Sequence, residues 1–132
     1  MNLIKPKKLE KGDTISIIAP SGGVKSDENL LRATAYLKSL GYNVKWGKNV
    51  LKTNKYLAGT DNERLEDLHN AFKDKGINAI IALRGGYGAI RLINKIDYNL
   101  IKQNPKIFAG YSDITGLSAM LLKHSGLITY SA

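Results

Sequence analysis

Several residue types and patterns are missing from this chain of 132 residues. It contains no cysteine, which excludes disulfide bonds, thiolate catalysis and cysteine metal ligands. No apolar run approaches the roughly 20 residues that a membrane-spanning helix needs. No apolar segment follows the basic residues 5–8, as a secretion signal would require. We therefore expect one soluble, cytoplasmic domain over residues 1–132 that makes no contact with a membrane.

Acidic residues are also scarce, with 11 Asp and Glu against 20 Lys and Arg, so the formal net charge is +9. Such a charge can indicate a nucleic-acid partner, because clustered lysines neutralise phosphates. The lysines here are scattered over predicted loops and helix faces, however, and only residues 5–11 form a dense group. We therefore predict a solvated surface and no nucleic-acid partner. A basic surface also suits a small acidic ligand.

Apolar segments of strand type alternate with amphipathic segments of helix type along the chain. We predict strands at residues 14–20, 42–46, 79–83, 106–111 and 127–130, and helices from Ser26 to Gly41, from Thr60 to Gly76, at 90–96 and at 113–124. This order predicts an α/β fold with a mostly parallel sheet and helices on both faces. Ligands bind such sheets at the carboxyl ends of the strands. We therefore expect the loops at residues 20–23, 84–88 and 111–113 to converge.

The sequence GYSDIT at residues 110–115 lies where a predicted strand turns into a helix. A serine in such a turn is lifted clear of the sheet, as in the nucleophile elbow, although Ile114 replaces the second glycine of that motif. The helix beneath it offers unpaired amides to a developing oxyanion. Ser112 is thus a candidate nucleophile. The alternative is that Ser112 only caps the helix.

The sequence RGGYG at residues 84–88 forms a second candidate loop after a strand. Its glycines would let backbone N–H groups approach a bound group, but the spacing is neither that of a dinucleotide-binding loop nor that of a P-loop. The alternative is a helix entry that needs small residues for packing. Arg84 could pair with a substrate carboxylate, since its guanidinium forms two parallel hydrogen bonds.

A serine nucleophile needs a general base, and the chain contains only His69 and His124. His124 lies at the far end of the helix that Ser112 begins, about 18 Å away at 1.5 Å per residue. His69 lies within another predicted helix beside an apolar stripe. We therefore expect the base of Ser112 to lie outside this chain.

Several short motifs together resemble the serine LD-carboxypeptidase family. They are KP at 5–6, GDTISIIAPS at 12–21, YLAGTD at 56–61 with Arg64 and DL at 67–68, RGGYG at 84–88 with RL at 91–92, DY at 97–98, NPK at 104–106 and GYSDIT at 110–115. The resemblance implies a flavodoxin-like fold, similar to that of class I glutamine amidotransferases. It also implies hydrolysis of an L,D-amide bond in a muropeptide, which releases terminal D-alanine during cell-wall recycling.

The resemblance also implies roles for individual residues. Ser112 is the nucleophile, and the N–H groups of Asp113 and Gly86 form the oxyanion hole. Arg84 and Tyr87 are our candidates for contacts with the substrate. No cofactor and no metal ion are expected. The glutamate and histidine of the triad come from a C-terminal domain, which we expect to lie beyond this chain, because family members continue after residues 127–130 and this sequence stops.

Other functions stay open at this point. A branch of the same family hydrolyses peptide-nucleotide antibiotics and confers self-immunity. The chain could also be a non-catalytic, flavodoxin-like module that holds a phosphate or nucleotide in its strand-end loops, or a bare interaction domain. Finally, the last strand is of the buried type, so the sheet should expose apolar surface, and we expect a homodimer or larger assembly.

Overall fold

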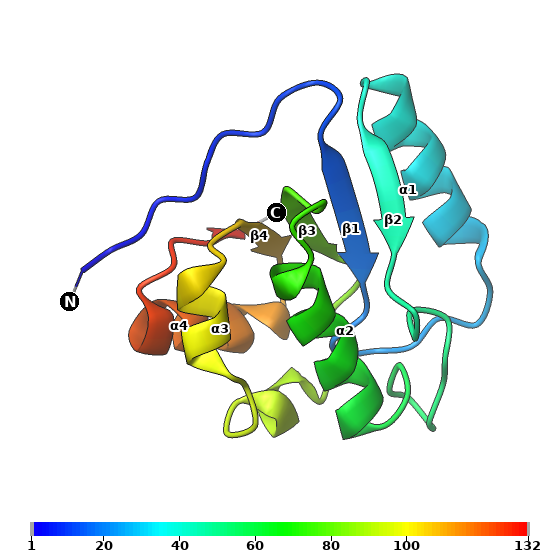
Figure 1. Cartoon of the computed structure of the whole chain (residues 1–132). Coiled ribbons are helices and arrows are strands. Elements are labelled where there is room, and N and C mark those ends of the chain that lie inside the picture. Colours follow the sequence, from blue (N-terminus) through cyan, green and yellow to red (C-terminus); the bar gives the residue numbers. More distant parts are fainter. Residues whose placement is uncertain (1, 132) are drawn as a thin grey trace.

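The core of the molecule is a five-stranded parallel β-sheet (Figure 1), and the computed structural model describes residues 2–131. The strand order is β2-β1-β3-β4-β5, which is the order of flavodoxin-like folds. The strands are β1 (Thr14–Ile18), β2 (Asn43–Trp46), β3 (Ala79–Ala82), β4 (Ile107–Gly110) and β5 (Tyr130–Ser131). The expected α/β fold with a parallel sheet is therefore confirmed.

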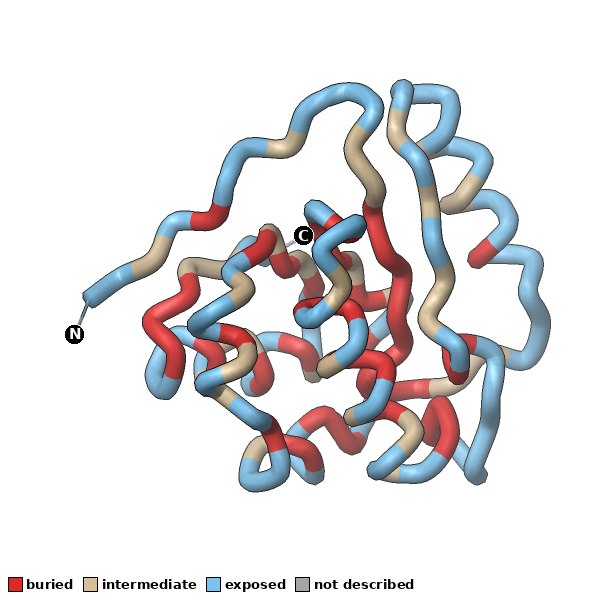
Figure 2. Tube along the Cα trace, in the orientation of Figure 1, coloured by how far each residue is buried: buried red, intermediate tan, exposed pale blue. Residues whose placement is uncertain are grey.

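Helices connect the strands and cover both faces of the sheet. They are α1 (Glu28–Ser39), α2 (Asp61–Lys73), α3 (Tyr98–Gln103) and α4 (Ile114–Ser125), with a single 3₁₀ turn, η1 (Ala89–Leu92). On one face Leu30 of α1 packs near Ile17 of β1. On the other, Leu68 of α2 and Leu117 of α4 pack with Phe108 of β4. Figure 2 shows the buried residues gathered along the sheet and the helix sides that face it. Among residues 2–131, no helix has the length and apolar character needed to cross a membrane.

The two faces are covered unequally. Successive side chains of a strand point to opposite faces, and Ile80 and Phe108 belong to the core beneath α2 and α4. Their neighbours Ile81, Ile107 and Ala109 therefore point to the side of α1, where they are only half-buried. We refer to this area over β3 and β4 as the open sheet face. The sequence predicted exposed apolar surface from its last strand, whereas these half-buried residues lie on β3 and β4.

Local signals explain how the longest helix begins and how the first one ends. Thr60 caps α2: its side chain accepts the Glu63 N–H at 3.1 Å, and the Glu63 carboxylate accepts the Thr60 N–H at 3.0 Å. Gly41 follows α1 with a φ of 98°, a conformation that favours glycine and ends the helix. The sequence predicted the start of one helix at Thr60 and the end of another at Gly41, as these contacts show.

Two expectations about elements were wrong, and one helix was missed. Asp27, not Ser26, occupies the N-cap position of α1; the Asp27 side chain makes no capping hydrogen bond, and the Ser26 hydroxyl accepts the Glu28 N–H at 3.5 Å. The helix expected at residues 90–96 is only the turn η1. A separate helix, α3, begins after Asp97, whose carboxylate accepts the Leu100 N–H at 3.1 Å. This Asp cap was a readable signal that the sequence analysis missed.

The last strand also begins later than expected. The amino-terminal segment pairs with the chain at residues 126–128, where the Ile4 N–H donates to the Gly126 carbonyl at 2.7 Å and the Ile128 N–H donates to the Ile4 carbonyl at 3.0 Å. These residues therefore pair with Ile4 rather than with β4. Pairing with β4 starts only at Tyr130. The chain thus pairs first with the distant amino terminus and only then, at β5, with β4.

Candidate active site at the carboxyl edge of the sheet

The three loops that were expected to converge do so at the carboxyl ends of β1, β3 and β4. The Gly22 N–H donates to the Gly85 carbonyl at 3.0 Å, which joins the loop after β1 to the glycine loop, residues 85–88. The Ser21 hydroxyl donates to the Asp113 carboxylate at 2.5 Å, which joins the first loop to the turn after β4. These contacts place Ser112 beside the glycine loop, at the edge where α/β sheets bind ligands.

Ser112 occupies the turn between β4 and α4 in a strained conformation. Its φ is 59°, in the left-handed region that residues with a Cβ seldom adopt. The residue is exposed, and within residues 2–131 its hydroxyl makes no hydrogen bond. Asp113, not Ser112, is the N-cap residue of α4, and no capping side chain is engaged there. The alternative that Ser112 serves only as a helix cap is therefore not supported.

Glycines let the loops approach the elbow closely. A methyl group on Gly85 would lie 2.9 Å from the Ser112 Cβ and 3.1 Å from its Oγ. A methyl group on Gly110 would lie 2.5 Å from the Ile114 side chain. Gly86 has a φ of 123°, which disfavours any side chain. Small residues at these positions are thus needed to bring the glycine loop against the serine.

Two backbone amides in the converging loops are free to donate. Among the described residues, the N–H groups of Gly86 and Asp113 form no hydrogen bond with the protein. The Asp113 N–H belongs to the first turn of α4, whose positive dipole end favours a negative charge. Together with an exposed hydroxyl, such donors can stabilise the oxyanion formed when a serine attacks a carbonyl.

Arg84 and Tyr87, the expected substrate contacts, both lie exposed beside this elbow. Arg84 donates through Nη1 to the Gly23 carbonyl at 3.0 Å, and in residues 2–131 it pairs with no carboxylate. The Tyr87 side chain is 77% exposed, and its ring meets that of Tyr56 edge-on at 6.3 Å. Both side chains are therefore accessible from solvent.

A buried polar cluster behind the elbow was missed by the sequence analysis as a functional element. The Asp113 carboxylate accepts the Ala89 N–H at 3.0 Å in addition to the Ser21 hydroxyl. The Arg64 guanidinium lies next to it and forms an ion pair with Asp61. Burial lowers the pKa of Arg64, and the Asp61 carboxylate opposes that shift. The sequence held a signal for this cluster: Arg64 lies four positions before Leu68 and therefore on the same, buried side of α2.

Neither histidine contacts Ser112. The ring of His69 accepts the Asp97 N–H through Nε2 at 3.0 Å, and burial lowers the pKa of His69. His124 lies in the last turn of α4, with its ring 4.7 Å from that of Tyr98. In the part of the chain that the structure describes, Ser112 therefore has no general base.

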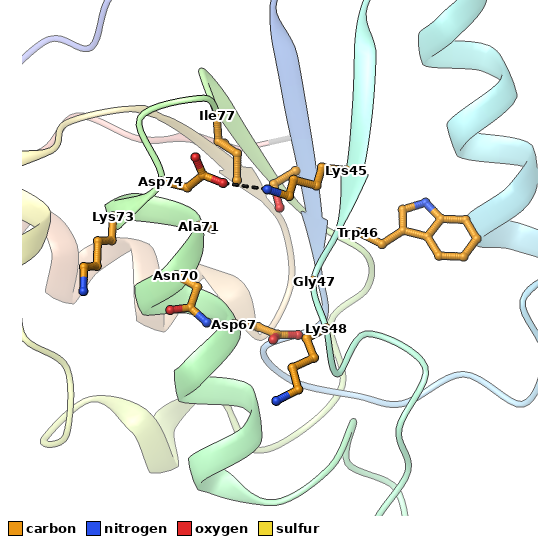
Figure 3. A pocket seen from close by; sticks show the side chains of 11 residues that line it. Lys45, Trp46, Gly47, Lys48, Asp67, Asn70, Ala71, Lys73, Asp74 and Ile77 are labelled. Carbon is orange, nitrogen blue, oxygen red and sulfur yellow. Dashed lines mark hydrogen bonds and ion pairs between the residues drawn. The ribbon is translucent and has the colours of Figure 1, made fainter.

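A separate groove of about 580 Å³ opens between β2 and α2 (Figure 3). An ion pair between Lys45 and Asp74 spans it at 2.7 Å, and the Trp46 side chain points away from it toward α1. Burial raises the pKa of Asp67 in its wall. The groove mixes lysines with carboxylates and includes none of the residues around Ser112, so it defines no ligand class.

Known proteins match this chain over most of its length. The sequence profile of the LD-carboxypeptidase N-terminal domain matches residues 15–132. A probable murein peptide carboxypeptidase of Bacillus subtilis is 44% identical over 126 residues, which cover 96% of this chain and 39% of that protein. The microcin C7 self-immunity protein MccF of Escherichia coli is 34% identical over 124 residues, which cover 92% of this chain and 36% of that protein.

A solved structure agrees with these matches. The crystal structure of an MccF-like protein from Bacillus anthracis superposes with a TM-score of 0.94 at 39% sequence identity. The superposition covers 98% of this chain and 40% of that structure. The chain therefore spans less than half of the length of these relatives.

Proposed function

Because the chain belongs to the LD-carboxypeptidase family, we propose that residues 1–132 are the N-terminal, nucleophile-bearing domain of a serine peptidase. Its substrate is a muropeptide, in which it hydrolyses the amide bond between an L-centre and a D-residue. The product is a terminal D-alanine, released in the cytoplasm as the cell wall is recycled. The observation that carries the proposal is the exposed Ser112 with a φ of 59°, followed by the free N–H of Asp113.

The reaction would proceed through an acyl-enzyme. The Ser112 Oγ attacks the carbonyl carbon of the L-residue while a general base takes the hydroxyl proton. The carbonyl oxygen becomes an oxyanion, which the N–H groups of Asp113 and Gly86 stabilise. The C–N bond then breaks, the proton passes to the leaving amine of D-alanine, and water hydrolyses the ester in the same way. In this proposal Arg84 pairs with the terminal carboxylate of the substrate, and Tyr87 covers the peptide.

The general base belongs to a second domain in this proposal. Neither His69 nor His124 contacts Ser112, and the chain spans only 39% of the length of the Bacillus subtilis relative. We infer that the glutamate and histidine of the triad lie in the C-terminal part of a longer protein. Residues 1–132 alone should then hydrolyse an L,D-tetrapeptide only in traces.

A second candidate substrate is a peptide-nucleotide antibiotic. Its support is the similarity to the microcin C7 self-immunity protein, at 34% identity. The same serine and amides would serve both substrates, because each presents an amide carbonyl to the nucleophile. The two differ in the group beyond that amide, so competition between a murein tetrapeptide and a peptide-nucleotide conjugate would distinguish them.

The test compares Ser112→Ala with Ser118→Ala in the longer protein. Ser118 is a half-buried serine of the same helix and serves as the matched control. We expect Ser112→Ala to lower kcat at least about 10³-fold with KM nearly unchanged, because only the nucleophile is lost. Ser118→Ala should behave as the wild type. Unchanged kcat in Ser112→Ala would refute the serine-peptidase role of Ser112 and favour a non-catalytic binding role, of the flavodoxin type, for residues 1–132.

A further inference from the structure

Arg64 connects two of the loops that surround Ser112. Its side chain extends from α2 and is fully buried. One terminal nitrogen, Nη1, donates to the carbonyl of Pro20 and to the carbonyl of Gly88, at 2.9 Å in each case. The other, Nη2, pairs with Asp61. A single guanidinium thus holds the end of β1 and the end of the glycine loop at a fixed separation.

Stability alone does not account for this arrangement. A buried guanidinium loses its hydration, and replacement of such ion pairs by apolar residues is often neutral or stabilising. Among residues 2–131 the Arg64 Nε has no hydrogen-bond partner, and the Asp61 carboxylate is shared with the exposed Arg91 and Lys95. Local rules are commonly broken in this way near functional sites. What Arg64 contributes is therefore the position of the two loops.

The Pro20 and Gly88 carbonyls that Arg64 binds each lie one residue before a group that donates to the Asp113 carboxylate, next to Ser112. Pro20 precedes Ser21, whose hydroxyl donates to the Asp113 carboxylate at 2.5 Å. Gly88 precedes Ala89, whose N–H donates to the same carboxylate at 3.0 Å. Arg64 and the Asp113 carboxylate thus hold the loop after β1 and the carboxyl end of the glycine loop, and the Gly22 N–H, which donates to the Gly85 carbonyl at 3.0 Å, joins the two loops on the other side of Gly86.

We infer that Arg64 is a positioning residue that sets the Gly86 amide relative to Ser112 and the Asp113 amide, and so builds the oxyanion hole. This inference rests on the proposed function. It names a role for a buried side chain that touches no substrate. Because an oxyanion hole loses much of its effect when a donor moves by about 1 Å, the two loops must be held tightly.

The first test uses residues 1–132 and needs no activity. Amide hydrogen exchange is compared between wild type, Arg64→Lys and the matched control Arg91→Lys, in which the exposed partner of Asp61 changes instead. A lysine ammonium cannot reproduce the planar fork that reaches both carbonyls and Asp61 together. We expect Arg64→Lys to speed exchange of the Gly22 and Ala89 amides about tenfold, while Ile80 in β3 keeps its protection.

The outcomes of this test are distinct. Equal acceleration at Gly22, Ala89 and Ile80 would mean that Arg64 only stabilises the whole fold, and wild-type exchange at Gly22 and Ala89 would mean that it does not hold the loops. Either result overturns the inference. The same local acceleration in Arg91→Lys would assign the effect to Asp61 rather than to Arg64, and would overturn it as well.

The second test measures kinetics in the longer protein. Arg64→Lys should lower kcat about 10- to 100-fold with KM within about twofold of the wild type, and Arg64→Met should lower kcat further. A rise in KM at constant kcat would overturn the positioning role. If Ser112→Ala keeps its turnover, the proposed peptidase fails instead, and the exchange measurements still decide whether Arg64 positions the loops.

Discussion

The strained conformation of Ser112 predicts an unusual response to glycine. At a φ of 59°, a Cβ crowds the backbone, and relief of this crowding is worth about 1–2 kcal/mol. Glycine also gains freedom in the unfolded chain, which costs about 0.5–1 kcal/mol. We therefore expect Ser112→Gly to be more stable than Ser112→Ala by about 0.5–1 kcal/mol. Ser112→Ala should match the wild type, because the hydroxyl makes no hydrogen bond within residues 2–131.

Two other positions provide matched controls. Lys55 is the other described residue besides glycine with a positive φ, also 59°, and lies in an exposed turn without a functional role in our proposal. Lys55→Gly should likewise exceed Lys55→Ala in stability. Ala35 lies exposed within α1, where Ala35→Gly should cost about 1 kcal/mol. The sign of the glycine effect should therefore reverse between the elbow and the helix.

The assay is thermal unfolding followed by the fluorescence of Trp46. Trp46 is the only tryptophan and reports on the fold, because its indole N–H donates to the Thr34 hydroxyl at 2.8 Å. A difference of 1 kcal/mol should shift the unfolding temperature by about 3–5 °C in a domain of this size. Ser112→Ala as stable as Ser112→Gly, with Lys55 and Ala35 behaving as expected, would refute a strained elbow.

Three further outcomes follow from the same structure. Burial lowers the pKa of His69, whose Nε2 accepts the Asp97 N–H. The unfolded chain therefore protonates this imidazole more readily than the folded chain does. The free energy of unfolding should then fall as the pH drops below about 6.5. His69→Gln should remove this dependence and His124→Gln should not; equal pH profiles for wild type and His69→Gln would contradict the assignment. In the longer protein, Arg84→Lys should raise KM about tenfold at constant kcat if the guanidinium pairs with a substrate carboxylate. A joint loss of kcat and thermal stability would instead show that Arg84 only holds the loop at Gly23. The open sheet face should make residues 1–132 form dimers or larger assemblies, and a monodisperse monomer in light scattering at high concentration would count against this expectation.

Much of the fold was readable along the chain. Apolar strands alternate with amphipathic helices, and right-handed crossovers then place the strands parallel in one sheet. Parallel strands bring their carboxyl ends to one edge, which is why the loops at residues 20–23, 84–88 and 111–113 could be expected to meet. The capping box at Thr60 and the stop at Gly41 depend only on neighbouring residues, and both are as expected.

The candidate site was readable in part for the same reason. Ser112 and the glycine loop each follow a strand directly, so their position at the edge depends on strand direction alone. The substrate contacts of Arg84 and Tyr87 and the oxyanion roles of Gly86 and Asp113 remain predictions. The structure contributes the φ of Ser112 and the close approach of Gly85 to it, neither of which any local pattern specifies.

Other features depended on residues far apart in the chain. The chain just before β5 pairs with Ile4, which lies more than 120 residues earlier. The contact of Arg64 with Pro20 joins residues 44 positions apart, and that of Ser21 with Asp113 joins residues 92 positions apart. Periodicity and caps express interactions within a few residues, so the sequence by itself determined the elements, their order and the edge that carries the nucleophile. Only the tertiary structure decided that Arg64 holds the strand-end loops. The Pro20 and Gly88 carbonyls are buried when α2 packs against these loops, and they then need a donor from the protein, which Arg64 supplies.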